Sequence, residues 1–175
     1  MEIVKTSIEG LVIIQPKVFD DERGYFMESY KESFIKENFP HLNFIQDNES
    51  KSSYGVLRGL HFQKPPFEQT KLVRVISGKV LDVAVDLREG SKTYGKHVSV
   101  ELSDSNKLQF LIPKGFAHGF VVMSEEAIFS YKVDNYYLSS HDSGIFYDSL
   151  DIDWIIPKTE IIISEKDRNL KPCFI

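Results

Sequence analysis

The chain has 175 residues, of which 42% are hydrophobic and 27% are charged, and these values are typical of one soluble globular domain with a substantial core. The net charge of −5 disfavours a nucleic-acid partner, although local arginines and lysines still allow a small anionic ligand. No run of about 18 apolar residues predicts a membrane span, and the first ten residues lack the apolar core of a signal peptide. The single cysteine, Cys173, excludes a disulfide framework. We therefore expect one domain over residues 1–175, in the cytoplasm, with no membrane partner.

The first predicted element is a helix over residues 30–38, which Pro40 closes. Short runs rich in β-branched and aromatic residues then predict strands at residues 71–76, 80–87, 97–102, 108–112, 120–123 and 127–133. Turn-forming residues separate several of these runs, at positions 77–78, 104–106 and 113–115. Strands at this spacing, without long helices between them, predict an all-β jelly-roll barrel or sandwich with a few short helices.

Residues 80–87 show the clearest alternation in the chain. Leu81 and Val83 fall on one face of the predicted strand, and Asp82 and Ala84 fall on the other. In an open sandwich the face with Asp82 is exposed to solvent, whereas in a jelly roll with a ligand cavity it forms the cavity wall. The sequence alone gives the solvent-exposed interpretation at least equal weight.

Two strand-like runs each carry a single histidine. The run GVLRGLHFQ, residues 55–63, contains His61, and the run IPKGFAHGF, residues 112–120, contains His118. Zinc and iron sites need three or four converging protein ligands, and the other three histidines lie outside these runs, so we predict no metal. A lone imidazole titrates near neutral pH and therefore suits a proton-transfer base. The alternative is a structural histidine, and His118 fits the end of a strand equally well.

Seven segments, in one order along nearly the whole chain, resemble the dTDP-4-dehydrorhamnose 3,5-epimerase family. They are FDDERGYF (19–26), FIQDNES (44–50), GVLRGLHFQ (55–63), QTKLVRVISGKVLDVAVDLREGSKTYGK (69–96), IPKGFAHGF (112–120), FSYKVDNYY (129–137) and ISEKDRNL (163–170). The resemblance implies a cupin-like jelly roll that forms a homodimer without a metal. It also implies that the substrate is a dTDP-linked 4-keto-6-deoxyhexose.

The chemistry implied by this resemblance needs no cofactor. The hydrogens on C3 and C5 of such a sugar flank the C4 carbonyl, so removal of either gives an enolate. Epimerisation then needs a base on one face, an acid on the other and a stabiliser for the negative charge on O4. Because the ketone is already present, no redox group is required. The sequence accordingly lacks a GxGxxG dinucleotide-binding motif.

Four positions match the catalytic residues of the family. The resemblance makes His61 the base and Asp167 the carboxylate that orients its ring. Tyr131 matches the acid on the opposite face, and Lys71 matches the cation near the C4 oxygen. From the residues alone, Tyr131 fits a core aromatic better and Asp167 fits a turn residue, so the roles of these two depend almost entirely on the resemblance.

Ten further positions match substrate-binding positions of the family. Arg23, Arg58 and Lys166 match cations on the phosphate side, where arginine can bind phosphate oxygens bidentately. Gln46 and Asn48 match polar contacts to the nucleotide.

Phe26 and Glu28 match an aromatic platform and an acceptor for the thymine edge, and in family dimers this early segment reaches the neighbouring subunit's site. His118 matches a residue beside the nucleotide, and Asp82 matches a position near the site. Asp142 stands where many members have glutamate, so its carboxylate is one methylene shorter.

Three other functions remain open on the sequence. An epimerase that inverts a single carbon, or one that uses another sugar nucleotide, retains much the same residues. A 3,4-ketoisomerase of related architecture moves the carbonyl instead of inverting a centre. A jelly roll that only binds a sugar nucleotide has no need for a base and an acid together.

Overall fold

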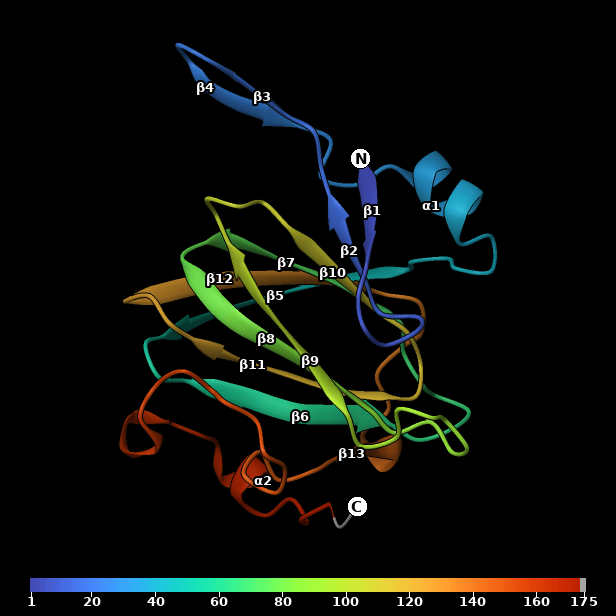
Figure 1. Cartoon of the computed structure of the whole chain (residues 1–175), viewed down its shortest axis with the longest axis vertical. Helices are drawn as coiled ribbons and strands as arrows, with labels where there is room; N and C mark the ends of the chain where they lie inside the picture. Colours follow the sequence, from blue (N-terminus) through green and yellow to red (C-terminus); the bar gives the residue numbers. More distant parts are fainter. Residues whose placement is uncertain (174–175) are drawn as a thin grey trace.

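The protein is an antiparallel β-sandwich, and its structure, a computed structural model, describes residues 1–173. Two sheets stack face to face, and a two-stranded hairpin projects from one end of the body (Figure 1). The prediction of an all-β jelly roll with a few short helices is confirmed. Among the described residues, no helix is long and apolar enough to cross a membrane.

The larger sheet has six strands. In spatial order they are β1 (Glu2–Lys5), β2 (Val12–Gln15), β10 (Gln109–Ile112), β7 (Lys71–Ser77), β12 (Glu126–Val133) and β5 (Gln46–Ser53). The smaller sheet has five, in the order β13 (Asp142–Gly144), β6 (Leu57–Gln63), β11 (Phe116–Val122), β8 (Lys79–Asp86) and β9 (His97–Ser103). The projecting hairpin consists of β3 (Val18–Asp21) and β4 (Gly24–Met27).

Within the described residues, helical structure is limited to four short segments. They are α1 (Glu32–Asn38), the 3₁₀ turns η1 (Ser139–His141) and η2 (Lys158–Glu160), and α2 (Glu165–Arg168). The helix predicted over residues 30–38 is therefore present as α1. Its buried Ile35 packs with Leu72 and Leu111 on the outer face of the six-stranded sheet.

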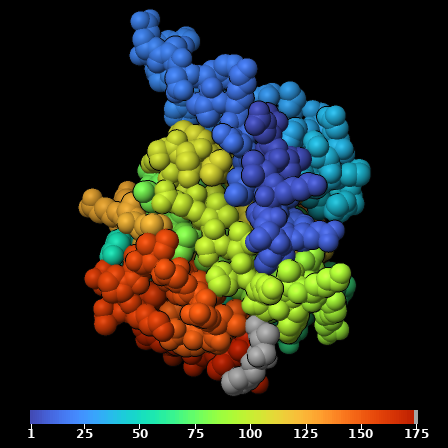
Figure 2. Space-filling model, in the orientation of Figure 1, coloured from blue at the N-terminus to red at the C-terminus, as the bar shows by residue number. Residues whose placement is uncertain are grey.

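Apolar layers bury both faces of the five-stranded sheet. Between the sheets, Phe120 of β11 stacks on Phe129 of β12 with ring centroids 4.1 Å apart. On the outer face, Leu81 and Val83 pack against Trp154 in the C-terminal segment. Figure 2 shows this last part of the chain, in orange and red, gathered over the lower body.

The position of Asp82 follows from this double coverage. Its side chain shares the inner face of β8 with Ala84, in the space between the sheets, and is 0% exposed. The solvent-exposed interpretation of this face is therefore wrong, because the facing sheet covers it. Asp82 is buried behind the cavity described below and is not one of the residues that line it. An ionisable group at such a position needs a partner, because an unpaired buried charge is costly.

Candidate active site

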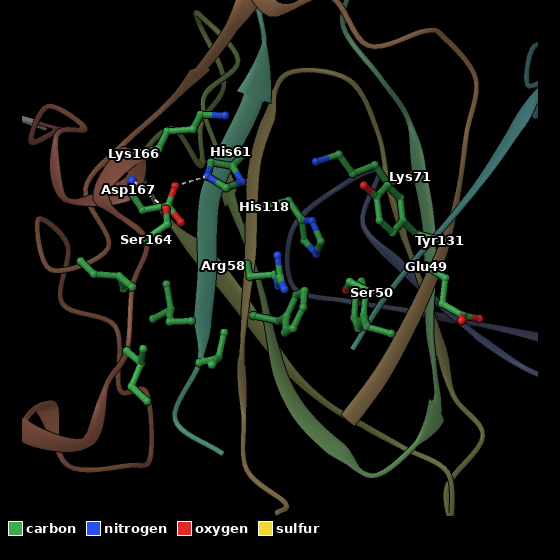
Figure 3. Close-up of a pocket in the computed structure, with 16 residues that line it drawn as sticks. Glu49, Ser50, Arg58, His61, Lys71, His118, Tyr131, Ser164, Lys166 and Asp167 are labelled. Atoms are coloured by element: carbon green, nitrogen blue, oxygen red, sulfur yellow. Dashed lines mark hydrogen bonds and ion pairs between the residues drawn. The ribbon is translucent and has the colours of Figure 1, made fainter. Parts of the chain in front are cut away.

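A cavity of about 510 Å³ lies between the two sheets and opens beside the C-terminal segment (Figure 3). Seven of the predicted site residues line it, and they come from β6, β7, β11, β12 and the segment that includes α2. These seven are Arg58, His61, Lys71, His118, Tyr131, Lys166 and Asp167. The rest of the wall consists of Glu49, two serines and six apolar side chains, so ten of the sixteen lining residues offer polar groups to a ligand.

His61 and Asp167 form a hydrogen-bonded pair, with His61 Nε2 2.6 Å from Asp167 Oδ1. The Asp167 side chain is 5% exposed, and the His61 side chain is 29% exposed. Burial alone raises the pKa of Asp167, but its hydrogen bond and charge interaction with His61, together with Ser164, outweigh burial and lower it. The ionised carboxylate therefore accepts a hydrogen bond from Nε2–H, which selects the tautomer whose Nδ1 is free to accept a proton.

The C-terminal segment brings Asp167 to His61 from 106 residues away in the chain. Ile162 forms a parallel bridge with Val56, and the Ile162 amide donates to the Gly55 carbonyl at 2.8 Å. Gly55 has a positive φ of +78°, and a Cβ there would lie 2.3 Å from the Glu160 carbonyl oxygen. Only glycine therefore lets the segment approach this closely.

Two glycines set the spacing of the two histidine strands. His61 of β6 lies directly opposite His118 of β11, and the register shifts between this pair and the next. A Cβ on Gly59 would lie 2.5 Å from the Gly119 Cα, and Gly59 also has a positive φ of +141°. Glycine at both positions lets the backbones touch, and the irregularity directs neighbouring side chains toward the cavity.

His118 is paired with Asp82 inside the sheet sandwich. Its Nε2 lies 2.9 and 3.0 Å from the two carboxylate oxygens, and the His118 side chain is 7% exposed. Burial lowers the pKa of His118, and the opposing attraction of Asp82 does not reverse this shift. The neutral ring donates Nε2–H to Asp82, so this pair resembles the first in its hydrogen bonding but is less accessible.

Lys71 and Tyr131 lie on the wall opposite the two histidines, in the six-stranded sheet (Figure 3). Tyr131 pairs with Val73, and Lys71 pairs with Val133, so the two side chains share one face on neighbouring strands. Burial lowers the pKa of Lys71 to about 8, against the attraction of Asp82 and Asp142. Burial raises the pKa of Tyr131, and the nearby charge of Arg58 partly offsets it. At neutral pH the wall presents an ammonium and a neutral phenol.

No group of three or more His, Cys, Asp or Glu side chains is arranged to hold a metal ion anywhere in residues 1–173. In both histidine pairs, one ring nitrogen is already engaged by a carboxylate. What the cavity offers chemically is a base with an oriented ring on one wall and a proton donor with a cation on the other.

Comparison with known proteins places this arrangement in a family. The family model described as dTDP-4-dehydrorhamnose 3,5-epimerase matches residues 5–173. The chain belongs to the dTDP-4-dehydrorhamnose 3,5-epimerase family. An epimerase from Methanothermobacter thermautotrophicus is 54% identical over 172 residues, which cover 97% of this chain and 92% of the relative.

Solved structures of family members match the whole architecture. The 3,5-epimerase of Elizabethkingia anophelis is 54% identical, with a TM-score of 0.92 over 98% of this chain and 95% of its own. The 3,5-epimerase of Legionella pneumophila, solved in complex with dTDP-4-keto-L-rhamnose, is 47% identical, with a TM-score of 0.93 over 97% and 91% of the two chains.

Other positions that match the family's binding residues lie at the edges of the cavity. Gln46 and Asn48 share the inner face of β5 with the cavity residue Ser50, and Gln46 Nε2 donates to Asn48 Oδ1 at 2.7 Å. Lys166 forms an ion pair with Asp142, and this hydrogen bond raises the pKa of Lys166. The shorter carboxylate of Asp142 thus still reaches a cationic partner.

The family positions in the N-terminal hairpin do not reach the cavity of this chain. The Arg23 side chain is 84% exposed and pairs with Asp21, and Phe26 is 67% exposed. Glu28, just after β4, pairs with Lys31. The hairpin extends away from the body (Figure 1), so contacts from these residues to a substrate remain a prediction that requires a second chain.

Sequence reasoning missed several residues of the cavity. The segment QDNESKSS of β5 has no apolar side chain, so no alternation marks it as a strand that supplies Ser50 to the wall. Ser164 also lines the cavity. At the start of α2, its Oγ accepts a hydrogen bond of 3.1 Å from the backbone amide of Asp167. The serine three residues before Asp167 is a helix-start signal that could have identified it.

Proposed function

We propose that the protein epimerises a dTDP-linked 4-keto-6-deoxyhexose at both C3 and C5. The observation that carries the proposal is the arrangement of a His–Asp pair on one wall of a cavity and a phenol beside an ammonium on the facing wall. Membership of the family supports the substrate class, because relatives bear the name of this reaction.

The proposed first step uses the unprotonated Nδ1 of His61. This nitrogen takes the hydrogen from C3, the C–H electron pair enters the C3–C4 bond, and negative charge develops on O4. Asp167 stabilises the imidazolium that forms and keeps the ring oriented. Tyr131 then donates its phenolic proton to the opposite face of C3, which restores the ketone with inverted configuration. The same exchange at C5 follows after His61 and Tyr131 regain their protonation states from solvent.

Lys71 has the proposed role of stabilising the enolate. An ammonium in a partly dry cavity interacts strongly with a nearby oxyanion, because little water screens the pair. Its pKa of about 8 leaves it charged at neutral pH. No step of this reaction changes the oxidation state of the substrate, so we propose no cofactor.

The nucleotide end of the substrate is proposed to extend toward Arg58 and Lys166. The guanidinium and ammonium oppose the diphosphate charge, while Gln46 and Asn48 offer amide groups along β5. His118 is proposed to lie beside the nucleotide, with its ring held by Asp82.

The remaining contacts are proposed to come from a second copy of the chain in a homodimer. Arg23 and Phe26 lie on the projecting hairpin and Glu28 follows it, and we propose that all three complete the site of a neighbouring subunit. Exposed aromatic side chains on such a projection favour contact with another protein surface.

A mixing experiment tests this arrangement. A His61→Asn chain and a chain with both Arg23→Ala and Phe26→Ala are each expected to be inactive alone. After random re-association, half of the dimers are mixed and each has one complete site, so about a quarter of wild-type activity should return. If mixed dimers form but activity does not return, the hairpin acts within its own chain and not on the neighbouring site.

The function itself is tested by incubating the protein with dTDP-4-keto-6-deoxyglucose in heavy water and following the sugar by NMR. Deuterium at both C3 and C5, with inversion, supports the proposal. Exchange and inversion at one carbon only indicates a single-centre epimerase, and movement of the carbonyl indicates a ketoisomerase. Binding without any exchange indicates a protein that holds the sugar nucleotide without converting it.

A further inference from the structure

A buried serine holds an arginine of the cavity lining. Ser52 of β5 is 8% exposed, and its Oγ accepts a hydrogen bond from Arg58 Nε at 3.0 Å. The two residues belong to different sheets, which the turn at residues 54–56 joins. We propose that Ser52 is a positioning residue that presents the Arg58 guanidinium to the substrate's diphosphate. The inference deepens the proposed function and rests on it.

The geometry of the hydrogen bond determines which part of Arg58 remains available. A guanidinium has five N–H donors in a planar fork, and the bond to Ser52 uses only the one on Nε. Within residues 1–173, the Arg58 side chain makes no other hydrogen bond or ion pair. Its two terminal nitrogens therefore form a free edge that suits two phosphate oxygens at once.

The surroundings of Arg58 make such an anchor useful. Arg58 is an exposed residue of the cavity lining, and a long side chain without an anchor samples many rotamers. A hydrogen bond formed before the ligand arrives lowers the ordering cost on binding. The charge of Arg58 also opposes the rise of the Tyr131 pKa, as expected for a guanidinium directed into the cavity. Figure 3 shows Arg58 below His118, pointing between the sheets.

The position also favours a small side chain. Ser52 pairs with Ala127 of β12, which is 1% exposed, so a larger residue would have little room in this row. The next residue, Ser53, lies on the opposite face of β5 and is exposed. It provides a matched control for removal of a hydroxyl from the same strand.

The test compares the affinities of wild type, Ser52→Ala and Ser53→Ala for dTDP and for thymidine by calorimetry. We expect Ser52→Ala to weaken dTDP binding about tenfold, because the hydrogen bond to a charged group is lost, and to leave thymidine binding unchanged. Ser53→Ala should change neither affinity. With substrate, Ser52→Ala should raise KM and leave kcat close to wild type, as expected for a residue that acts through binding.

A double-mutant cycle separates positioning from a general structural effect. When Arg58 is already replaced by alanine, removal of the Ser52 hydroxyl should have no further effect on dTDP affinity. The inference is overturned if Ser52→Ala binds dTDP like wild type, if it weakens dTDP and thymidine equally, or if its effect persists without Arg58. Failure of the wild-type protein to bind dTDP would instead overturn the proposed function.

Discussion

His61 and His118 lie directly opposite each other on β6 and β11, yet each ring bonds a carboxylate from a different part of the fold. His61 receives Asp167 from the C-terminal segment, whereas His118 receives Asp82 from the neighbouring strand β8. The His61 side chain is 29% exposed and the His118 side chain 7%, so the first ring is the more accessible of the two to a reacting carbon. The difference in exposure favours His61 over His118 for the proposed role of base.

Replacement of His61 by asparagine should slow proton abstraction strongly. A positioned general base contributes about 10² to 10⁴ in rate, so deuterium uptake at both C3 and C5 should fall by a factor in that range. Asparagine is similar in size and neutral, so dTDP affinity should persist. NMR in heavy water and calorimetry measure the two quantities, and exchange at near-normal rates at either carbon would contradict the assignment.

Replacement of Asp167 by asparagine should slow the reaction about 100-fold, with little change in dTDP affinity. The amide no longer stabilises the imidazolium and can hold the ring in the wrong tautomer. Steady-state kinetics of Asp167→Asn can be compared with those of Glu165→Gln, which removes an exposed carboxylate from the same short helix. Equal activity of the two variants would show that the His61–Asp167 pair has no catalytic role.

Lys71 should set the alkaline limit of activity. Burial lowers its pKa to about 8, so the required ammonium is present below this pH and is lost above it. We expect kcat/KM to fall as pH rises through about 8, about tenfold for each further unit. The arginine in Lys71→Arg stays charged throughout this range. The fall of kcat/KM above about pH 8 should therefore be absent from the pH profile of this variant, whatever its absolute rate. If kcat/KM of this variant still falls through about pH 8, a group other than Lys71 causes the fall.

Chelation should leave the activity unchanged. Each histidine in the cavity already bonds a carboxylate, and residues 1–173 provide no group of three metal-ligating side chains. The measurement compares protein dialysed against EDTA with protein dialysed against buffer alone, both assayed by NMR. A loss of activity that a divalent cation restores would require a metal-dependent mechanism.

The sequence predicted those strands that have a recognisable local residue pattern. Strands with alternating or β-branched residues, such as β8 and β12, were predicted within a residue or two of their observed bounds. The strand β5 was not predicted, because its inner face borders a polar cavity and its outer face is exposed, so neither face needs apolar residues. The burial of Asp82 was also beyond reach, since it depends on which elements cover β8.

The candidate site was predictable through its motifs and not through its contacts. Resemblance to the family identified His61 and Asp167, but no local pattern indicates that residues 106 positions apart meet at 2.6 Å. The role of Ser52 depends on a contact between the two sheets, and it therefore became visible only in the structure. For Arg23 and Phe26 the resemblance goes further than the structure, because a single chain does not contain the surface that they are proposed to meet.

Asp86 should stabilise the fold without contributing to the cavity. Its side chain is 0% exposed and accepts hydrogen bonds from the Arg88 guanidinium and from the hydroxyls of Ser91 and Thr93, at 2.6 to 2.8 Å. Burial alone raises the pKa of Asp86, but these donors outweigh burial and hold the pKa well below its usual range. Asp86→Asn replaces one acceptor oxygen by a donor and leaves Arg88 unpaired, so it should cost about 2–4 kcal/mol of unfolding free energy at neutral pH.

The pH dependence of this cost has a defined sign. A carboxyl whose pKa is lowered by folding contributes stability above its unfolded value of 3.8 and loses it as pH falls toward the folded value. The deficit of Asp86→Asn relative to wild type should therefore be constant between about pH 5 and 8 and shrink below about pH 4. Urea unfolding at several pH values measures it, with Glu89→Gln as the exposed control. A deficit below about 0.5 kcal/mol at pH 7, or one that grows on acidification, would show that this network is not a source of stability.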